Sequence, residues 1–417
     1  MSVRGFNLPT LVEINGIDEA GRLGEDIYFV RVGVRIDEEV QLLLRNLDHF
    51  GKLFVRKEDL FGREEKNLQK YLRDSLDDPC SAVSVFRMDV NVQMKLLREY
   101  LRFQSEDIFK ARGVLIGAFE TIMAGKESGD QDDTSEKDFW QVVTLLRMYE
   151  QYPFLYESVV KSYGMMNVAA RLDKLSNLFR NTLSPGSRYM LVVQVDGGYP
   201  FVCWWHKFLD DTTRFLNIKK GNAHFAGVAQ GDSFYPAIST AGTLAYVINR
   251  FPQRAFFLPT IEVEYDEKFP LDEAYYYTHA TSIVRPTFDN RILLIGAIDP
   301  DLKSCIPYCL HRADRKKTFE PFQINVSAKN FFEEYGYGKT ENTLIIAGRL
   351  TAAQQKDDFR FCKERGYSCY HLADFKESII SLLTDVENEI DLLHKDKKTK
   401  LASAFEPMKK RCLTELT

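Results

Sequence analysis

Two segments near the start of the chain alternate apolar and polar positions. Residues 12–18 (VEINGID) end at the turn-prone pair Ala20-Gly21, and residues 27–36 (IYFVRVGVRI) place three valines on one face and two arginines on the other. A period of two residues predicts β-strands, and the short glycine-containing connection predicts a hairpin.

The pattern that follows alternates helical and strand-like segments. It predicts helix over 37–73, 92–124, 139–183 and 236–250, and strands over 81–87 and 189–195. Residues 125–138 contain no large apolar side chain and predict an exposed, disordered acidic loop. Beyond Pro252 the pattern predicts a strand at 291–297, a strand–helix–strand unit over 343–372 and a charged amphipathic helix from 385.

Length and composition limit the class of protein. A chain of 417 residues with 45% hydrophobic and 28% charged residues predicts a globular protein of two or three domains. No apolar run approaches the roughly 18 residues of a membrane span, and the N-terminus has no signal-peptide pattern. Seven cysteines, an odd number, fit a reducing compartment. We therefore expect a cytoplasmic protein, or a nuclear one in a eukaryote, without a membrane partner.

Acidic residues stand at strand ends or beside tight turns at three places in the sequence. They occur in Ile17-Asp18-Glu19-Ala20-Gly21-Arg22, in Val195-Asp196-Gly197 and in Gly231-Asp232-Ser233. Strand ends of α/β sheets bring side chains to a shared site, and carboxylates are the ligands that Mg²⁺ prefers. The net charge of −5 does not indicate a nucleic-acid binder, although an enzyme needs only a local basic groove.

These three segments resemble, in order, the motifs of the type 2 ribonucleases H. Residues 16–22 (GIDEAGR) resemble the opening motif, residues 195–197 (VDG) the second, and residues 231–241 (GDSFYPAISTA) the third. The resemblance implies an α/β fold with a ribonuclease H-like mixed sheet flanked by helices. It also implies a metal-dependent endonuclease that cuts the RNA strand of RNA/DNA hybrids or ribonucleotides in DNA.

The resemblance further implies which residues are catalytic and which contact the substrate. Asp18, Glu19, Asp196 and Asp232 are the expected catalytic residues and ligands of two Mg²⁺ or Mn²⁺ ions, with Gly21, Arg22, Ser233 and Tyr246 as substrate contacts. Neighbours on a strand point to opposite faces, so Asp18 and Glu19 share a site only if the chain turns between them.

The chain also departs from the family pattern. Leu23 replaces the small residue that usually follows the arginine, Tyr246 stands where a lysine is usual, and helical segment 139–183 has no family counterpart. The expected organisation is a nuclease core of residues 1–110 and 187–251, a helical insertion over 111–186, and a C-terminal α/β region over 252–417 that is a possible binding site for a protein partner.

Several alternatives stay open. The same fold could act on single-stranded or structured DNA, and Leu23 and Tyr246 favour that alternative. It could also bind nucleic acid, or serve as a scaffold, without cleavage. The basic residues Arg56, Lys57, Arg63 and Lys66 either contact phosphates or pair with the acidic residues among them.

Overall fold

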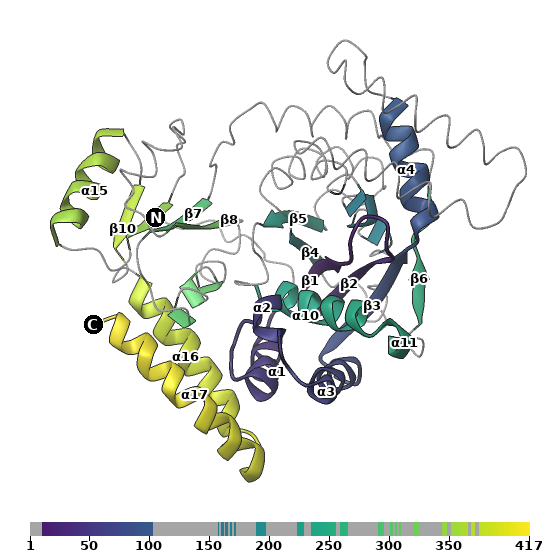
Figure 1. Ribbon diagram of the computed structural model, residues 1–417. Coiled ribbons are helices and arrows are strands. Elements are labelled where there is room, and N and C mark those ends of the chain that lie inside the picture. The colour runs from purple at the N-terminus through teal and green to yellow at the C-terminus, as the bar shows by residue number, and fades with distance from the viewer. Residues whose placement is uncertain are drawn as a thin grey trace, which may run out of the picture.

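A computed structural model describes the protein over a defined part of its sequence. The described residues are 11–102, 189–196, 223–228, 235–255, 259–265, 291–295, 320–324, 344–347, 352–365, 368–371 and 375–417, with single residues between 157 and 171 and between 301 and 309. Within them the fold is mixed α/β, as expected, with two sheets and flanking helices (Figure 1). The predicted acidic loop over 125–138 lies outside them, as does most of the predicted helix over 139–183.

The larger sheet has six strands in the order β5-β4-β1-β2-β3-β6. Their bounds are β1 Leu11–Ala20, β2 Ile27–Arg35, β3 Ser81–Met88, β4 Tyr189–Asp196, β5 Ala223–Val228 and β6 Thr260–Glu262. β1, β2 and β3 pair antiparallel in sequence, which confirms the predicted hairpin. β4 adds parallel to β1 and β5 parallel to β4, while β6 adds parallel to β3. A central β1 therefore has an antiparallel neighbour on one side and a parallel neighbour on the other.

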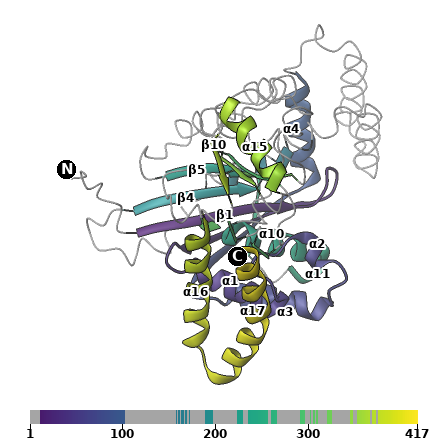
Figure 2. The same ribbon diagram turned by 90° about the vertical axis from the view of Figure 1, so that its left-hand side faces the viewer.

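One face of this sheet is apolar and is covered by helices. α10 (Pro236–Arg250) lies against β1 and β2, with α1 (Glu39–Phe50) and α3 (Glu65–Leu76) on the same side and α4 (Val90–Arg102) on the other (Figures 1 and 2). The valines at 30, 32 and 34 are fully buried on that face, where they pack with Ile14 and the apolar stripe of α10. The alternation predicted for β2 is thus the alternation of a core face with a second, more polar face.

The predicted helix over 37–73 is divided into three. α1 ends at Gly51, α2 (Lys57–Leu60) is a single turn, and α3 begins after Gly62. Both glycines have positive φ, 70° and 76°, the left-handed conformation that ends a helix and that other residues adopt at a cost. Glycine thus sets the breaks that the hydrophobic period alone did not locate.

The second face of the sheet carries a buried ion pair. Arg31 on β2 donates from Nη2 to Oε1 of Glu13 at 2.6 Å and from Nε to Oδ1 of Asn15, also at 2.6 Å. All three residues are at most 1% exposed. Gly33 borders the guanidinium so closely that a Cβ there would overlap it. Because a buried charge is costly unless paired, the two β1 residues are what allow Arg31 at this position.

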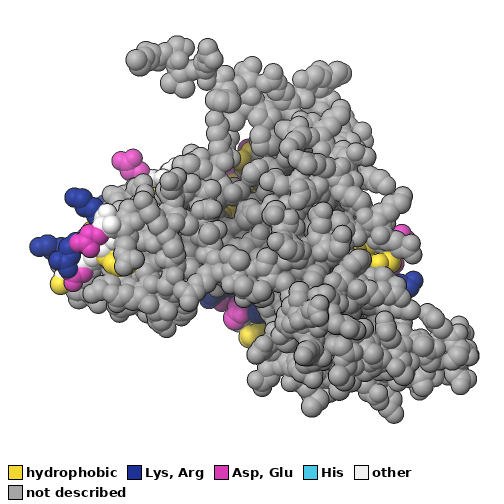
Figure 3. Space-filling view, turned by 90° about the horizontal axis from the view of Figure 1, so that it is seen from above, with side chains coloured by type: hydrophobic (Ala, Val, Ile, Leu, Met, Phe, Trp, Pro, Cys, Tyr) yellow, Lys and Arg dark blue, Asp and Glu magenta, His cyan; other side chains and the backbone are white. Residues whose placement is uncertain are grey.

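The smaller sheet has four parallel strands in the order β10-β9-β7-β8. The strands are β7 Arg291–Ile295, β8 Glu320–Ile324, β9 Leu344–Ala347 and β10 Ser368–His371. α15 (Ala352–Arg365) connects β9 to β10, which confirms the predicted strand–helix–strand unit. Seen from above, the exposed side chains of α15 mix both signs of charge, so this helix does not form a patch of one sign (Figure 3).

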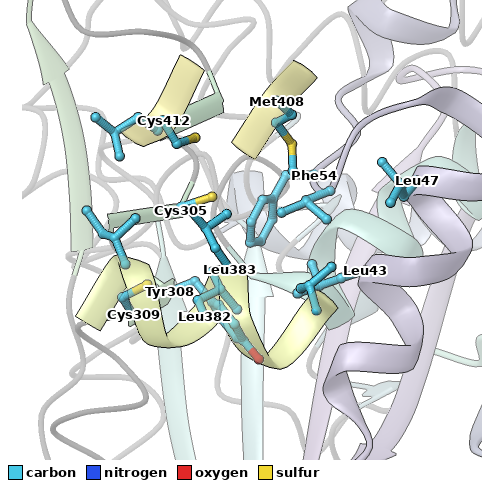
Figure 4. Packing of buried hydrophobic residues seen from close by; sticks show 14 of the residues in the cluster. Leu43, Leu47, Phe54, Cys305, Tyr308, Cys309, Leu382, Leu383, Met408 and Cys412 are labelled. Carbon is cyan, nitrogen blue, oxygen red and sulfur yellow. The ribbon is translucent and has the colours of Figure 1, made fainter. Parts of the chain in front are cut away.

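Two C-terminal helices pack on α1. α11 (Pro252–Ala255) is a short turn after α10. The C-terminal helices are α16 (Lys376–Asp391) and α17 (Lys395–Glu415), where the sequence pattern predicted a single tail helix from 385. Their core joins Leu43 and Leu47 of α1 to Leu383 of α16 and Met408 of α17 (Figure 4).

The cysteines of this core are structural thiols. Cys305, Cys309 and Cys412 are at most 3% exposed. A hydrogen bond with Cys412 and burial raise the pKa of Cys305 well above its ordinary value, which keeps the unreactive thiol form. These residues therefore fill space in the core.

Replacing Arg31 should test how much the buried ion pair on the second face of the sheet contributes to stability. Arg31→Met leaves the buried Glu13 carboxylate without its cation, and we expect a loss of about 3–5 kcal/mol in the free energy of unfolding, measured by urea denaturation. Arg35→Met is the matched control on the same strand, because its exposed pair with Asp37 should contribute about 0–1 kcal/mol. Equal losses in the two variants would show that burial of the Arg31 pair is energetically unimportant.

Candidate active site

Asp18 lies on the core face of β1, directly under α10. Its carboxylate is half-buried, and Oδ1 accepts the backbone N–H of Glu19 at 2.7 Å. A Cβ on Gly242 would overlap Oδ2, so this glycine makes the space in which the carboxylate sits. Gly16, two residues earlier on the same face, lets the backbone of Ala237 approach β1 in the same way. Two glycines, one on each element, therefore position Asp18.

Asp196 is brought next to Asp18 by strand register. Ile17 of β1 pairs with Val195 of β4, and the residue after each is Asp18 and Asp196 respectively. Parallel neighbours lie about 4.8 Å apart across a sheet, so the backbones of the first and second motifs meet at the carboxyl ends of adjacent central strands. The side chain of Asp196 lies outside the described part of the structure.

Glu19 lies on the opposite face from Asp18. The chain continues as β1 through Ala20, and the turn comes only at Gly21, so the condition for a site shared by both carboxylates is not met in this geometry. Oε1 of Glu19 is 3.0 Å from Nζ of Lys161, which also lies 2.7 Å from Oε1 of Glu157.

The charge of Lys161 further separates the role of Glu19 from that of Asp18. Burial by itself lowers the pKa of Lys161, but the carboxylates of Glu19 and Glu157 more than offset it, so its pKa lies above the ordinary value and the ammonium stays charged. The Glu19 carboxylate is therefore already paired with a cation of the chain itself, which it shares with Glu157.

Two of the expected substrate contacts belong to the turn after β1. Gly21 has φ +126°, and a Cβ there would lie only 2.6 Å from the carbonyl oxygen of Asp26, which explains the glycine after the acidic pair. Arg22 is exposed, and its carbonyl accepts the N–H of Glu25. The side chain of Arg22 is therefore free to reach a ligand, while its backbone shapes the turn.

The remaining expected residues differ in how far the structure describes them. Asp232 and Ser233 lie outside the described residues. Tyr246 is half-buried on α10, one turn beyond Gly242. Of the third motif, only the segment that enters α10 is therefore described.

Gln93, which the sequence pattern did not single out, holds the turn after β1. It is fully buried on α4; Oε1 accepts the N–H of Gly24 at 3.0 Å, and Nε2 donates to the carbonyl of Glu25 at 2.6 Å. Leu23 within this turn is 5% exposed and so belongs to the core. A glutamine inside an amphipathic helix gives no signal of this role, because the turn that it holds lies far away in the sequence.

The fit of a divalent metal rests on Asp18 and its neighbours. The site supplies a half-buried carboxylate at the end of a central strand, with a second aspartate beside it in register, and hard cations prefer such oxygen ligands. Among the described residues, no group of three or more His, Cys, Asp or Glu converges as a metal site would require. Of the four expected ligands, only Asp18 and Glu19 have described side chains.

Comparisons with known proteins leave the family unassigned. No family model matches the sequence, and no curated protein matches it significantly. Within the described residues, no helix combines the length and apolar character needed to cross a membrane.

A double-mutant cycle should establish the two-faced arrangement. Glu19→Gln and Lys161→Met should each destabilise the protein, and their coupling in unfolding free energy should be roughly 0.5–3 kcal/mol because the two groups touch. Asp18→Asn combined with Lys161→Met is the control, and its coupling should be smaller because Asp18 points to the other face. Stronger coupling of Lys161 to Asp18 than to Glu19 would contradict the arrangement.

Proposed function

We propose that the protein is a divalent-metal-dependent endonuclease with a ribonuclease H-like core. The observation that carries the proposal is the register of β1 and β4, in which Asp18 and Asp196 end adjacent central strands. These two residues come from the first and second motifs that resemble the type 2 ribonucleases H, and they are far apart in sequence.

The arrangement of the sheet supports the same proposal. The resemblance implies a mixed sheet flanked by helices, and the central strand β1 has one antiparallel and one parallel neighbour. The third motif leads into α10, which covers Asp18 through Gly242. The first two motifs thus end the adjacent strands β1 and β4, and the third leads into the helix that covers β1.

In this proposal Asp18, Asp196 and Asp232 hold Mg²⁺ or Mn²⁺. The bound ions would activate a water molecule and stabilise the leaving oxygen of a phosphodiester. Asp18 is held in place by the Glu19 N–H and by the space at Gly242, which fixes its orientation before substrate binds. Glu19, paired with Lys161, serves this site through its backbone N–H rather than as a carboxylate ligand.

The preferred substrate is the RNA strand of RNA/DNA hybrids, or ribonucleotides embedded in DNA. Single-stranded or structured DNA is the second candidate. One observation favours it: Leu23 is buried and its turn is held by Gln93. A core side chain thus closes the segment after the acidic pair, where the resemblance implies that the backbone approaches the sugar 2′-hydroxyl.

Asp18→Asn should abolish cleavage. With Mg²⁺ and then Mn²⁺, the wild type is offered an RNA/DNA hybrid, a duplex with one ribonucleotide, single-stranded RNA, and single- and double-stranded DNA. Loss of a residue that hydrogen-bonds a metal ligand costs about 10–100-fold, so loss of a ligand itself should lower the rate by more than about 100-fold. Asp37→Asn, on an exposed turn, is the control. An absence of cleavage on every substrate with either metal would refute the proposal.

Gly242→Ala should separate activity from stability. Alanine favours the helix by about 0.5–1 kcal/mol, which offsets part of the cost of displacing Asp18, so the unfolding free energy should change little. A displacement of the reacting geometry by about 1 Å can lower the rate about 100-fold, and we expect a loss of that size. Asn249→Ala, half-buried on the same helix, should retain wild-type cleavage. Full activity in Gly242→Ala would show that Asp18 does not act where it lies.

A further inference from the structure

An exposed aromatic side chain lies against the helix that covers the candidate active site. Phe61 is 60% exposed and is the only aromatic residue among the large hydrophobic side chains exposed in the described part of the chain. Its ring lies 6.1 Å from that of Tyr246, at an interplanar angle of 58°. Tyr246 is one helical turn, about 6 Å along α10, beyond the glycine that borders Asp18.

A cation completes this surface. Nη1 of Arg250 donates to the hydroxyl of Tyr246 at 3.1 Å, and its guanidinium carbon lies 6.0 Å from the Tyr246 ring and 5.4 Å from the Phe251 ring. Arg250 is exposed, and a guanidinium carries five N–H donors, so this contact leaves donors that a ligand can use. Phe61, Tyr246 and Arg250 therefore form one continuous aromatic and cationic surface, which we call the aromatic platform.

The turn that carries Phe61 is held rigidly. Nζ of Lys52 lies 2.6 Å from Oδ1 of Asp59, and Nε of Arg63 donates to the carbonyl of Asp59 at 3.2 Å. Leu60, the preceding residue, is fully buried and anchors the turn in the core. Phe61 is thus held outward by its neighbours, and ordering it costs little when a ligand binds.

We propose that the aromatic platform binds a single-stranded stretch of the nucleic acid that enters the active site, with an unpaired base stacked on Phe61 and a phosphate on Arg250. An aromatic face stacks on any unpaired base, and an arginine beside it supplies the charge that phosphates require. Exposed charges of both signs flank Phe61, with Arg56 and Lys57 as well as Glu58 and Glu64, so the phosphate contact is assigned to Arg250, which touches the Tyr246 ring. This inference rests on the proposed nuclease function.

The test measures binding separately from cleavage. Fluorescein-labelled single-stranded DNA and RNA oligonucleotides of mixed sequence are titrated with the full chain in Ca²⁺, and the dissociation constant follows from fluorescence anisotropy. Phe61→Ala should weaken binding about 5- to 150-fold, the range found when one stacked base loses its aromatic partner. Phe61→Trp should retain affinity. Its tryptophan emission should fall on binding by more than that of the wild type, because the added indole stacks on a base.

Two further variants make the test specific. Arg250→Gln should reduce the slope of log Kd against log salt concentration by about 0.7, as expected for one lost phosphate contact on a single strand. Leu392→Ala is the matched control, because Leu392 is 80% exposed at the turn between α16 and α17, and it should bind as the wild type does.

The outcomes distinguish this inference from the nuclease proposal. Wild-type affinity in Phe61→Ala, with cleavage retained, would overturn the aromatic platform and leave the nuclease proposal intact. Failure of the wild type to bind either oligonucleotide would overturn the platform, and both proposals would fall if no substrate were cleaved either. A change in sedimentation of Phe61→Ala without a change in oligonucleotide affinity would also overturn the platform, because it would identify Phe61 as a contact between copies of the chain.

Discussion

The close approach of α10 to β1 is the constraint on which the rest of the structure depends. Gly16 has no side chain to hold the helix away, so the backbone of Ala237 rests directly on the strand. Further along the helix, Gly242 leaves space for the carboxylate of Asp18. Ser239, between them, exchanges hydrogen bonds with both backbone groups of Val55 and so ties the next segment to the same helix. Core packing and the position of the candidate metal ligand therefore follow from one contact.

The two faces of β1 solve different physical problems. The core face excludes water through apolar packing and admits the carboxylate of Asp18 only at its edge. The other face carries paired charges: buried Glu13 pairs with Arg31, and half-buried Glu19 pairs with Lys161. Breaking such pairs costs more than the pairs themselves contribute, so they fix the surrounding segments in place. The adjacent acidic residues of the first motif thus serve separate roles.

Local patterns predicted local structure well. The hairpin of β1 and β2, the strand β4, the helix α10 and the strand–helix–strand unit around α15 follow from periodicity and glycine placement. Periodicity did not separate Asp18 from Glu19, because that depends on where the strand ends, and the antiparallel pairing continues to Ala20. The contacts of Lys161 and Gln93 join segments distant in sequence, and the partner of a lysine or a glutamine cannot be predicted from the residue type. The positions of Asp232 and Ser233 and the division into three regions stay predictions.

In the proposed nuclease, the turn after β1 and the aromatic platform together bear on how substrate would be recognised. Buried Leu23 and the Gln93 hydrogen bonds close the turn, which limits how near a sugar can come to its backbone. An aromatic ring such as Phe61 stacks on a base whatever sugar the base carries. A site that depends on stacking more than on the 2′-hydroxyl would select for unpaired bases over ribose. Stacking therefore supports single-stranded nucleic acid, the second candidate substrate, whereas the motif resemblance supports RNA/DNA hybrids, and cleavage of the substrate panel decides between them.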